Sequence, residues 1–110
     1  MLQGEIWEMY FDPVAGSEQS GRRPAVIVSG NLMNKYLGVV IVCPLTSNIR
    51  NYKGNVVLKP DPDNNLKKPS EILVFHIRSV SKKRLKNRLG TIKPEELKRL
   101  KQGLDDLMRY

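Results

Sequence analysis

The sequence predicts a small, mainly antiparallel β-barrel closed by a C-terminal helix. Short apolar runs rich in β-branched residues recur along the chain, and segments rich in Gly, Pro and Asn separate them. Only residues 93–110 have apolar positions at helical spacing, and strands do not alternate with helices. At 110 residues, the chain is expected to form one domain, 1–110, with a single core.

Apolar runs bounded by turn-forming residues mark the expected strands. These runs are residues 4–11, 25–29, 39–45, 55–58 and 70–80. Residues 30–38 are expected to form one or two helical turns. Pro44 lacks an N–H group, so we expect it to mark a bulge or the end of its strand. Residues 59–69 contain three prolines and are expected to form an exposed, mobile loop.

Residues 93–110 predict a long helix. Pro94 suits the first helical position, and the acidic residues after it complement the positive helix end. Ile92 and Leu97 have the spacing of a hydrophobic staple. Gly103 is expected to permit close packing in mid-helix. One apolar face is expected to contact the core or a second subunit, and its residues are Leu97, Leu100, Leu104, Leu107 and Met108.

The charge balance suggests a polyanionic partner. Nineteen Lys and Arg residues face eleven Asp and Glu residues, which gives a net charge of +8. Long-range attraction of this kind favours binding to phosphates. Residues 81–90 form the densest basic segment. An inert basic surface, or a face that binds an acidic protein, is the alternative.

Several classes of site are excluded by composition. The single cysteine, Cys43, forms no internal disulfide, which fits a buried thiol in a reducing cytosol. The single histidine, His76, rules out a two-histidine ribonuclease mechanism within one chain and leaves no clustered zinc ligands. We find no phosphate-binding loop and no dinucleotide fingerprint, so no cofactor or metal is expected. No signal peptide and no membrane span are apparent.

The polar segment 11–24 is the first candidate for chemistry. Between Ser17 and Pro24 it holds a carboxylate, an amide, hydroxyls and guanidinium groups. Loops held by a rigid scaffold are where binding and catalysis concentrate. We therefore expect this segment to lie over an RNA-binding groove, with a solvated hairpin connection as the alternative.

Several short motifs, in order along the chain, resemble the MazF/PemK (Kid) toxins of bacterial toxin–antitoxin modules. They are Gly4-Glu5-Ile6-Trp7, Phe11-Asp12-Pro13, Gly16-Ser17-Glu18-Gln19, Gly21-Arg22-Arg23-Pro24-Ala25-Val26, Pro44-Leu45-Thr46-Ser47 and Ile77-Arg78-Ser79-Val80. The resemblance implies an SH3-like β-barrel with a C-terminal helix, usually a homodimer. It also implies metal-independent, sequence-specific cleavage of single-stranded RNA, often mRNA, and inhibition by a cognate antitoxin.

The resemblance also implies site residues. The family's principal catalytic pair matches Arg23 and Thr46, and an implicated glutamate matches Glu18. Where the family usually has an acid followed by glutamine, this chain has Phe75 and His76. Further residues are expected to bind RNA: Ser17, Gln19, Arg22, Ser47, Asn48, Arg78, Lys82, Lys83 and Arg84.

The resemblance implies products that end in a 2′,3′-cyclic phosphate and a 5′-hydroxyl. The chemistry of these side chains suits the attack by the RNA 2′-hydroxyl that such products require. Arg23 can bind phosphate oxygens bidentately, and Thr46 can donate a hydrogen bond to another. Glu18 and His76 are the alternatives for acid or base, and a structural role for His76 has equal weight. For Arg22 and residues 82–88, a solvated or RNA-backbone-binding surface is favoured over catalysis.

Two other functions remain open at this point. One is a non-catalytic toxin of the CcdB type, which acts by binding a protein. The other is an inactive relative that retains only antitoxin binding. Incubation with a long unstructured RNA in the presence of chelator separates these from a ribonuclease.

Overall fold

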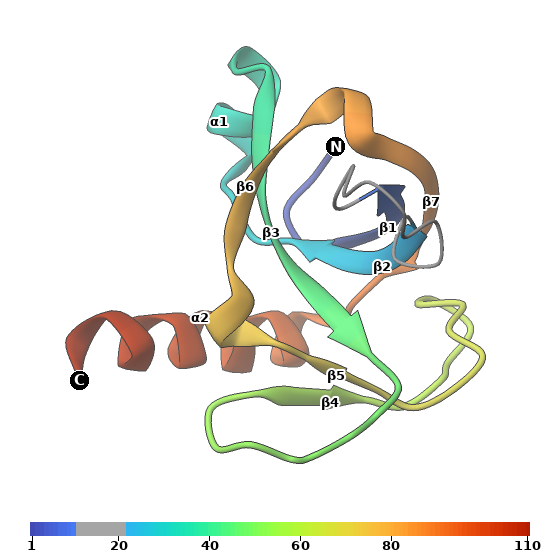
Figure 1. Ribbon diagram of the computed structural model, residues 1–110, viewed down its shortest axis with the longest axis vertical. Coiled ribbons are helices and arrows are strands. Elements are labelled where there is room, and N and C mark those ends of the chain that lie inside the picture. The colour runs from blue at the N-terminus through green and yellow to red at the C-terminus, as the bar shows by residue number, and fades with distance from the viewer. Residues whose placement is uncertain (11–21) are drawn as a thin grey trace, which may run out of the picture.

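The computed structural model describes residues 1–10 and 22–110. Its elements, in order, are β1 (Glu5–Tyr10), β2 (Arg22–Ile27), α1 (Asn31–Tyr36), β3 (Val39–Thr46), β4 (Val56–Leu58), β5 (Ser70–Ile72), the 3-10 turn η2 (Val74–His76), β6 (Arg78–Ser81), the 3-10 turn η3 (Lys82–Arg84), β7 (Leu85–Thr91) and α2 (Pro94–Arg109). The strands curl into a half-barrel, and α2 runs along its base (Figure 1). The predicted mainly antiparallel β fold with a C-terminal helix is confirmed.

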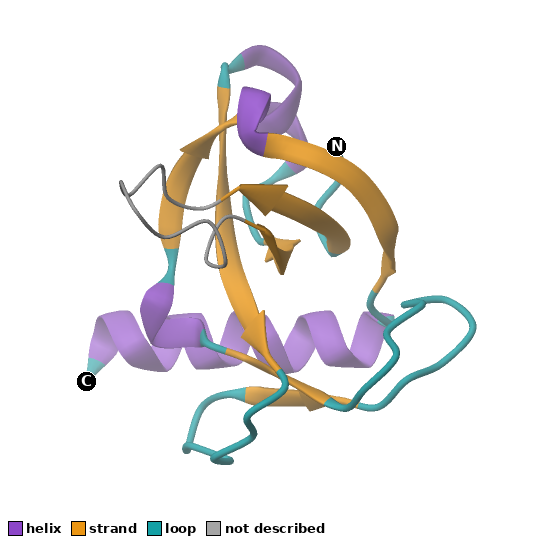
Figure 2. Ribbon diagram, turned by 45° about the vertical axis from the view of Figure 1, so that its right-hand side comes forward, coloured by secondary structure: helices purple, strands orange, loops and turns teal. Residues whose placement is uncertain are grey.

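The strand β3 is the centre of the sheet. The hydrogen-bonded order is β4-β5-β3-β2-β1-β7, and β6 also pairs with β3. One edge of β3 pairs with β2, while the other edge is shared by β6 near Val39 and by β5 near Thr46. Every strand pairing among the described residues is antiparallel. Figure 2 shows the strong curvature of the strands and the position of α2 between the β4–β5 pair at the bottom of the view and the other strands above.

Apolar side chains pack on both faces of the sheet, because successive residues of a strand point to opposite sides. Cys43 and Leu45 of β3 join a cluster that also contains Leu100 of α2. Val40 and Val42, from the same strand, join a second cluster with Met9. Burial raises the pKa of the Cys43 thiol to about 12, so this cysteine is an inert core residue.

The helix α2 follows its prediction closely. The Lys93 N–H donates to Glu96 Oε1 at 2.8 Å and so satisfies a donor at the helix start. Leu100 is fully buried, whereas Leu107 and Met108 are 43% and 75% exposed. The apolar stripe therefore packs on the core through its first two-thirds and leaves its end on the surface.

The expectation of one long strand over residues 70–80 is wrong. The chain pairs with β3 as β5, leaves it as η2, and returns as β6. Pro44 supplies the physical reason. The Pro44 carbonyl accepts the Leu73 N–H at 2.8 Å. The N–H and C=O groups of one residue in an antiparallel strand point to the same neighbouring strand, so the N–H that proline lacks would also have faced Leu73. The hydrogen-bond ladder between β3 and β5 therefore lacks one bond at Pro44, and the chain leaves β3 after Leu73. Pro44 itself lies within β3, which continues to Thr46, so a strand end at Pro44 is also wrong.

Residues 59–69 form a loop, but its expected exposure is only partly correct. Asn64 is fully buried. Its side chain accepts the N–H groups of Asp61 and Leu66 and donates to the Lys59 carbonyl. Gly90 of β7 packs so tightly on this loop that a Cβ there would stand 2.1 Å from the Asp63 carbonyl oxygen. The interior of the loop is therefore fixed by an asparagine side chain.

Candidate active site

A hollow of about 210 Å³ lies where β2 and β5 begin and β3 ends. Its lining residues are Arg23, Pro24, Leu45, Thr46, Ser47 and Ser70. Antiparallel pairing places the start of β2 beside the end of β3. Ala25 pairs with Pro44, and the same register continued by two positions sets Arg23 opposite Thr46. The fold thus brings together the two side chains expected to form the catalytic pair.

Arg23 is part of β2 and pairs with Met9 of β1, so it does not belong to the preceding loop as the sequence suggested. Its side chain is exposed. A strand fixes the backbone from which the guanidinium extends, while the long side chain can still adjust to a ligand. Such a group binds two phosphate oxygens at once.

Thr46 is the last residue of β3. Its Oγ1 accepts the Asn48 N–H at 3.1 Å, which closes a short turn after the strand. A threonine hydroxyl accepts and donates at the same time. Because the Asn48 amide uses an acceptor site on Oγ1, the hydroxyl proton remains available for donation. Ser47 is exposed and adds a second hydroxyl at the rim of the hollow.

Arg22 is held differently from Arg23. It donates to Glu8 Oε1 of β1, and its guanidinium lies 6.0 Å from the centre of the Tyr10 ring. Hydrogen bonds from Arg22 and then Asn87 lower the pKa of Glu8. The two neighbouring arginines therefore differ: the charge of Arg22 is compensated by a carboxylate, whereas Arg23 lines the hollow.

His76 lies on η2, not in a strand, and is exposed. Its ring meets Phe75 edge-on with 4.7 Å between centroids, and Phe75 meets Tyr52 edge-on at 5.7 Å. We call Tyr52, Phe75 and His76 the aromatic row. His76 is not among the residues that line the hollow of Arg23 and Thr46.

The basic residues of β6 and η3 lie towards the other end of β3. Ser81, directly before η3, pairs with Val39, and Arg78 pairs with Val42. Val39 and Thr46 bound the eight residues of β3, which in an extended strand places them about 23 Å apart. The residues concerned are Arg78, Lys82, Lys83 and Arg84. Glu18, Ser17 and Gln19 lie outside the described residues.

Glu71 was missed by sequence reasoning. It is fully buried in β5 and pairs with Thr46 across the sheet. Burial alone would raise the pKa of Glu71, but hydrogen bonds from Asn55 and from the backbone of residues 50–52 outweigh it and hold the pKa below its ordinary value. Its signal in the sequence is a lone carboxylate directly before the apolar run 72–75.

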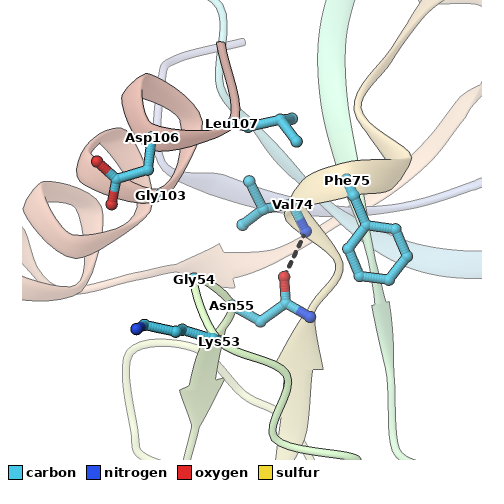
Figure 3. A pocket seen from close by; sticks show the side chains of 8 residues that line it. All are labelled: Lys53, Gly54, Asn55, Val74, Phe75, Gly103, Asp106 and Leu107. Atoms are coloured by element: carbon cyan, nitrogen blue, oxygen red, sulfur yellow. Dashed lines mark hydrogen bonds between the residues drawn. The ribbon is translucent and has the colours of Figure 1, made fainter. Parts of the chain in front are cut away.

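A second cavity, of about 190 Å³, lies between α2, η2 and the loop before β4 (Figure 3). Its lining includes Asn55, Phe75 and Leu107. The Asn55 Oδ1 atom accepts the Val74 N–H at 3.0 Å, which ties this loop to η2.

Within residues 1–10 and 22–110, no three His, Cys, Asp or Glu side chains are grouped to hold a metal ion. The helices in this part of the chain are too short or too polar to cross a membrane.

Comparisons with known proteins agree with this geometry. The family model described as "PemK-like, MazF-like toxin of type II toxin-antitoxin system" matches residues 2–108. Endoribonuclease MazF9 of Mycobacterium tuberculosis is 35% identical over 109 residues, which cover 94% of this chain and 92% of that protein.

Solved structures match as well. The crystal structure of MazF from Deinococcus radiodurans has a TM-score of 0.81 and 30% identity, and covers 100% of this chain and 97% of that one. A MazE–MazF structure from the same organism has a TM-score of 0.80 and 27% identity, with 98% of this chain and 95% of that chain covered.

Proposed function

Since the chain belongs to the PemK-like, MazF-like toxin family of type II toxin–antitoxin systems, we propose that it is a MazF-type endoribonuclease. The observation that carries the proposal is the hollow in which Arg23 and Thr46 lie together. The relative from M. tuberculosis, which is named an endoribonuclease, supports it. The net charge of +8 suits a nucleic-acid substrate.

The proposed reaction is cleavage of single-stranded RNA by its own 2′-hydroxyl. The 2′-oxygen attacks the adjacent phosphorus, and the bond from phosphorus to the 5′-oxygen breaks. The products are a 2′,3′-cyclic phosphate and a 5′-hydroxyl. Since the nucleophile belongs to the substrate, the enzyme supplies mainly alignment and stabilisation of charge.

Arg23 and Thr46 suit the phosphoryl group. The Arg23 guanidinium neutralises charge on the non-bridging oxygens, and the Thr46 hydroxyl donates to one of them. A hydrogen bond from the Asn48 amide already orients the Thr46 oxygen before substrate arrives. Such preorganised donors avoid reorganisation during the reaction.

Proton transfer is assigned to Glu18 or His76 in this proposal. His76 lies in the aromatic row rather than in the lining of the hollow, so an RNA would have to reach both places. A His76→Gln variant tests the role. A large fall in kcat with loss of one limb of the pH–rate profile supports acid or base action, and an unchanged profile assigns His76 to the aromatic row alone.

The RNA-binding surface is proposed to continue from the hollow in two directions. Exposed Ser47 and Asn48 follow Thr46 directly, and the basic residues of β6 and η3 lie further along β3. Arg78, Lys82, Lys83 and Arg84 would bind the RNA backbone and add affinity without base specificity.

The proposed protein partners are a cognate antitoxin and a second copy of the chain. The description of the family names a toxin–antitoxin system, and a related MazF was crystallised with MazE. The homodimer is supported by the exposed apolar side chains Leu107, Met108 and Tyr110 at the end of α2. Sedimentation of the pure protein tests the dimer.

The decisive experiment is incubation of the pure protein with a long unstructured RNA in the presence of chelator. We expect fragments that end in 2′,3′-cyclic phosphate, identified by mass spectrometry. Fully intact RNA would reject the proposal and favour a CcdB-like toxin that binds a protein, or an inactive relative.

A further inference from the structure

The buried carboxylate of Glu71 fixes an exposed loop, residues 47–55, to the sheet. Oε1 accepts the N–H groups of Arg50 at 2.8 Å and Asn51 at 3.1 Å. Oε2 accepts the Tyr52 N–H at 2.9 Å and the Asn55 Nδ2 donor at 3.0 Å. All four of these donors are neutral amide groups, so hydrogen bonds stabilise the charge of the carboxylate.

The conformation of this loop depends on that carboxylate. Three successive backbone N–H groups converge on it, and Asn51 adopts a left-handed conformation with φ of 56°. Successive amides that point to one anion form a concave backbone nest. Without the carboxylate, the donors of these partly buried hydrogen bonds would lose their partner, and a donor that is shielded from water and left unsatisfied is costly.

Glu71 is also a direct cross-strand neighbour of Thr46. Residues opposite each other in an antiparallel pair project from the same face, with Cβ atoms about 5 Å apart. The loop that Glu71 holds begins right after Thr46 and supplies the Asn48 amide that binds the Thr46 hydroxyl. At its other end, Asn55 binds Glu71. Asn55 also binds the backbone of Val74 (Figure 3).

We propose that Glu71 is a positioning residue, which fixes the loop after β3 so that the Thr46 hydroxyl points into the hollow. This inference rests on the proposed endoribonuclease function. Glu71 is buried and does not touch the substrate. Its effect is transmitted through the loop backbone and the Asn48 amide.

The variant Glu71→Gln tests the proposal. Glutamine offers a single acceptor oxygen, so its NH₂ group would face two of the four donors. We expect kcat to fall by about tenfold to a hundredfold, because small displacements of a catalytic group cost this much. The KM for RNA should stay within about twofold, since the phosphate-binding side chains remain.

Glu96→Gln is the matched control. Glu96 is also a buried carboxylate that accepts a backbone N–H, but it caps α2 away from the hollow. Both variants should lose stability, and only Glu71→Gln should lose kcat per folded molecule. If Glu71→Gln fails to fold, Asn55→Ala is the substitute variant. It removes one hydrogen-bond donor to Glu71 and should also lower kcat.

Amide hydrogen exchange without RNA separates this inference from the proposed function. We expect the Asn48 amide to exchange at least about tenfold faster in Glu71→Gln than in the wild type or in Glu96→Gln. If the wild type does not cleave RNA, the endoribonuclease proposal fails. The exchange rates still test whether Glu71 fixes the conformation of residues 47–55. A folded Glu71→Gln protein with wild-type kcat, or with an unchanged Asn48 amide, would overturn the inference.

Discussion

Gly103 of α2 contacts the backbone of Gly54 so closely that a Cβ on Gly103 would stand 2.3 Å from the Gly54 carbonyl oxygen. Gly54 itself has a φ of 92°, which suits glycine. This contact joins the helix to the end of the loop that Glu71 anchors. It explains why a residue unfavourable to helices lies in the middle of α2.

Replacement of Gly103 by alanine should therefore destabilise the protein. Helix propensity alone would favour alanine by about 1 kcal/mol. The collision with a backbone carbonyl outweighs this gain, and we expect a net loss of about 1–3 kcal/mol in the free energy of unfolding, measured with urea. Gly38→Ala, where nothing lies within 4 Å of the added Cβ, should change it by less than about 0.5 kcal/mol. A more stable Gly103→Ala protein would contradict the packing argument.

Arg23→Ala and Thr46→Ala should each reduce cleavage of RNA by at least about a hundredfold, the usual effect of removing a group that stabilises transition-state charge. Both residues lie at the surface end of their strands, so circular dichroism and thermal unfolding should change little. Lys101→Ala removes one positive charge from an exposed site on α2 and serves as the matched control. Near-wild-type cleavage by either site variant would refute the assignment.

Acid should weaken the fold through Glu71. The pKa of Glu71 is lowered in the folded state from its ordinary value of 4.5, so the unfolded chain takes up this proton first. The stabilisation is present above that value and is lost as the pH falls through the folded pKa. In urea titrations between about pH 6 and pH 3, Glu71→Gln should show a flatter decline than the wild type.

Some acid sensitivity should remain in that variant, because hydrogen bonds also lower the pKa of Glu5 against the effect of its burial. Identical slopes for the wild type and Glu71→Gln would show that the Glu71 carboxylate has no preference for ionisation in the folded protein.

RNA binding should weaken steeply with salt. Contacts between basic side chains and phosphates release counterions, so the logarithm of affinity falls linearly with the logarithm of salt concentration. Replacing Lys82, Lys83 and Arg84 together with alanine should make this slope shallower by about two units for single-stranded RNA. Fluorescence anisotropy with a non-cleavable RNA measures both slopes. A slope unaffected by the triple substitution would exclude η3 from the RNA path.

Sequence patterns predicted the strands and the helix that form because of their own residues. Alternation and aromatic bulk identified β1, β-branched runs identified β3 and β4, and the helical spacing of Leu97 and Leu100 identified α2. The break between β5 and β6 has its cause in Pro44, a residue of another strand, and periodicity within residues 70–80 contains no trace of it. For the same reason, Asn64 in the middle of a polar loop gave no sign of complete burial.

The candidate site divides in the same way. Arg23 and Thr46 were predicted from short motifs, and the antiparallel register explains why they meet. Glu71 was missed because its role depends on donors from residues 50–55, which only the fold brings to it. His76 was expected in a strand, and its place in the aromatic row follows from the same Pro44 break.

The Asn64 network has a consequence for anyone who modifies this protein. The segment 59–69 is polar and rich in proline, which would make it an attractive place for an affinity tag or a fluorophore. Its backbone instead surrounds the buried side-chain amide of Asn64 and packs closely against Gly90. An insertion there would pull that amide out of the interior and destabilise the fold.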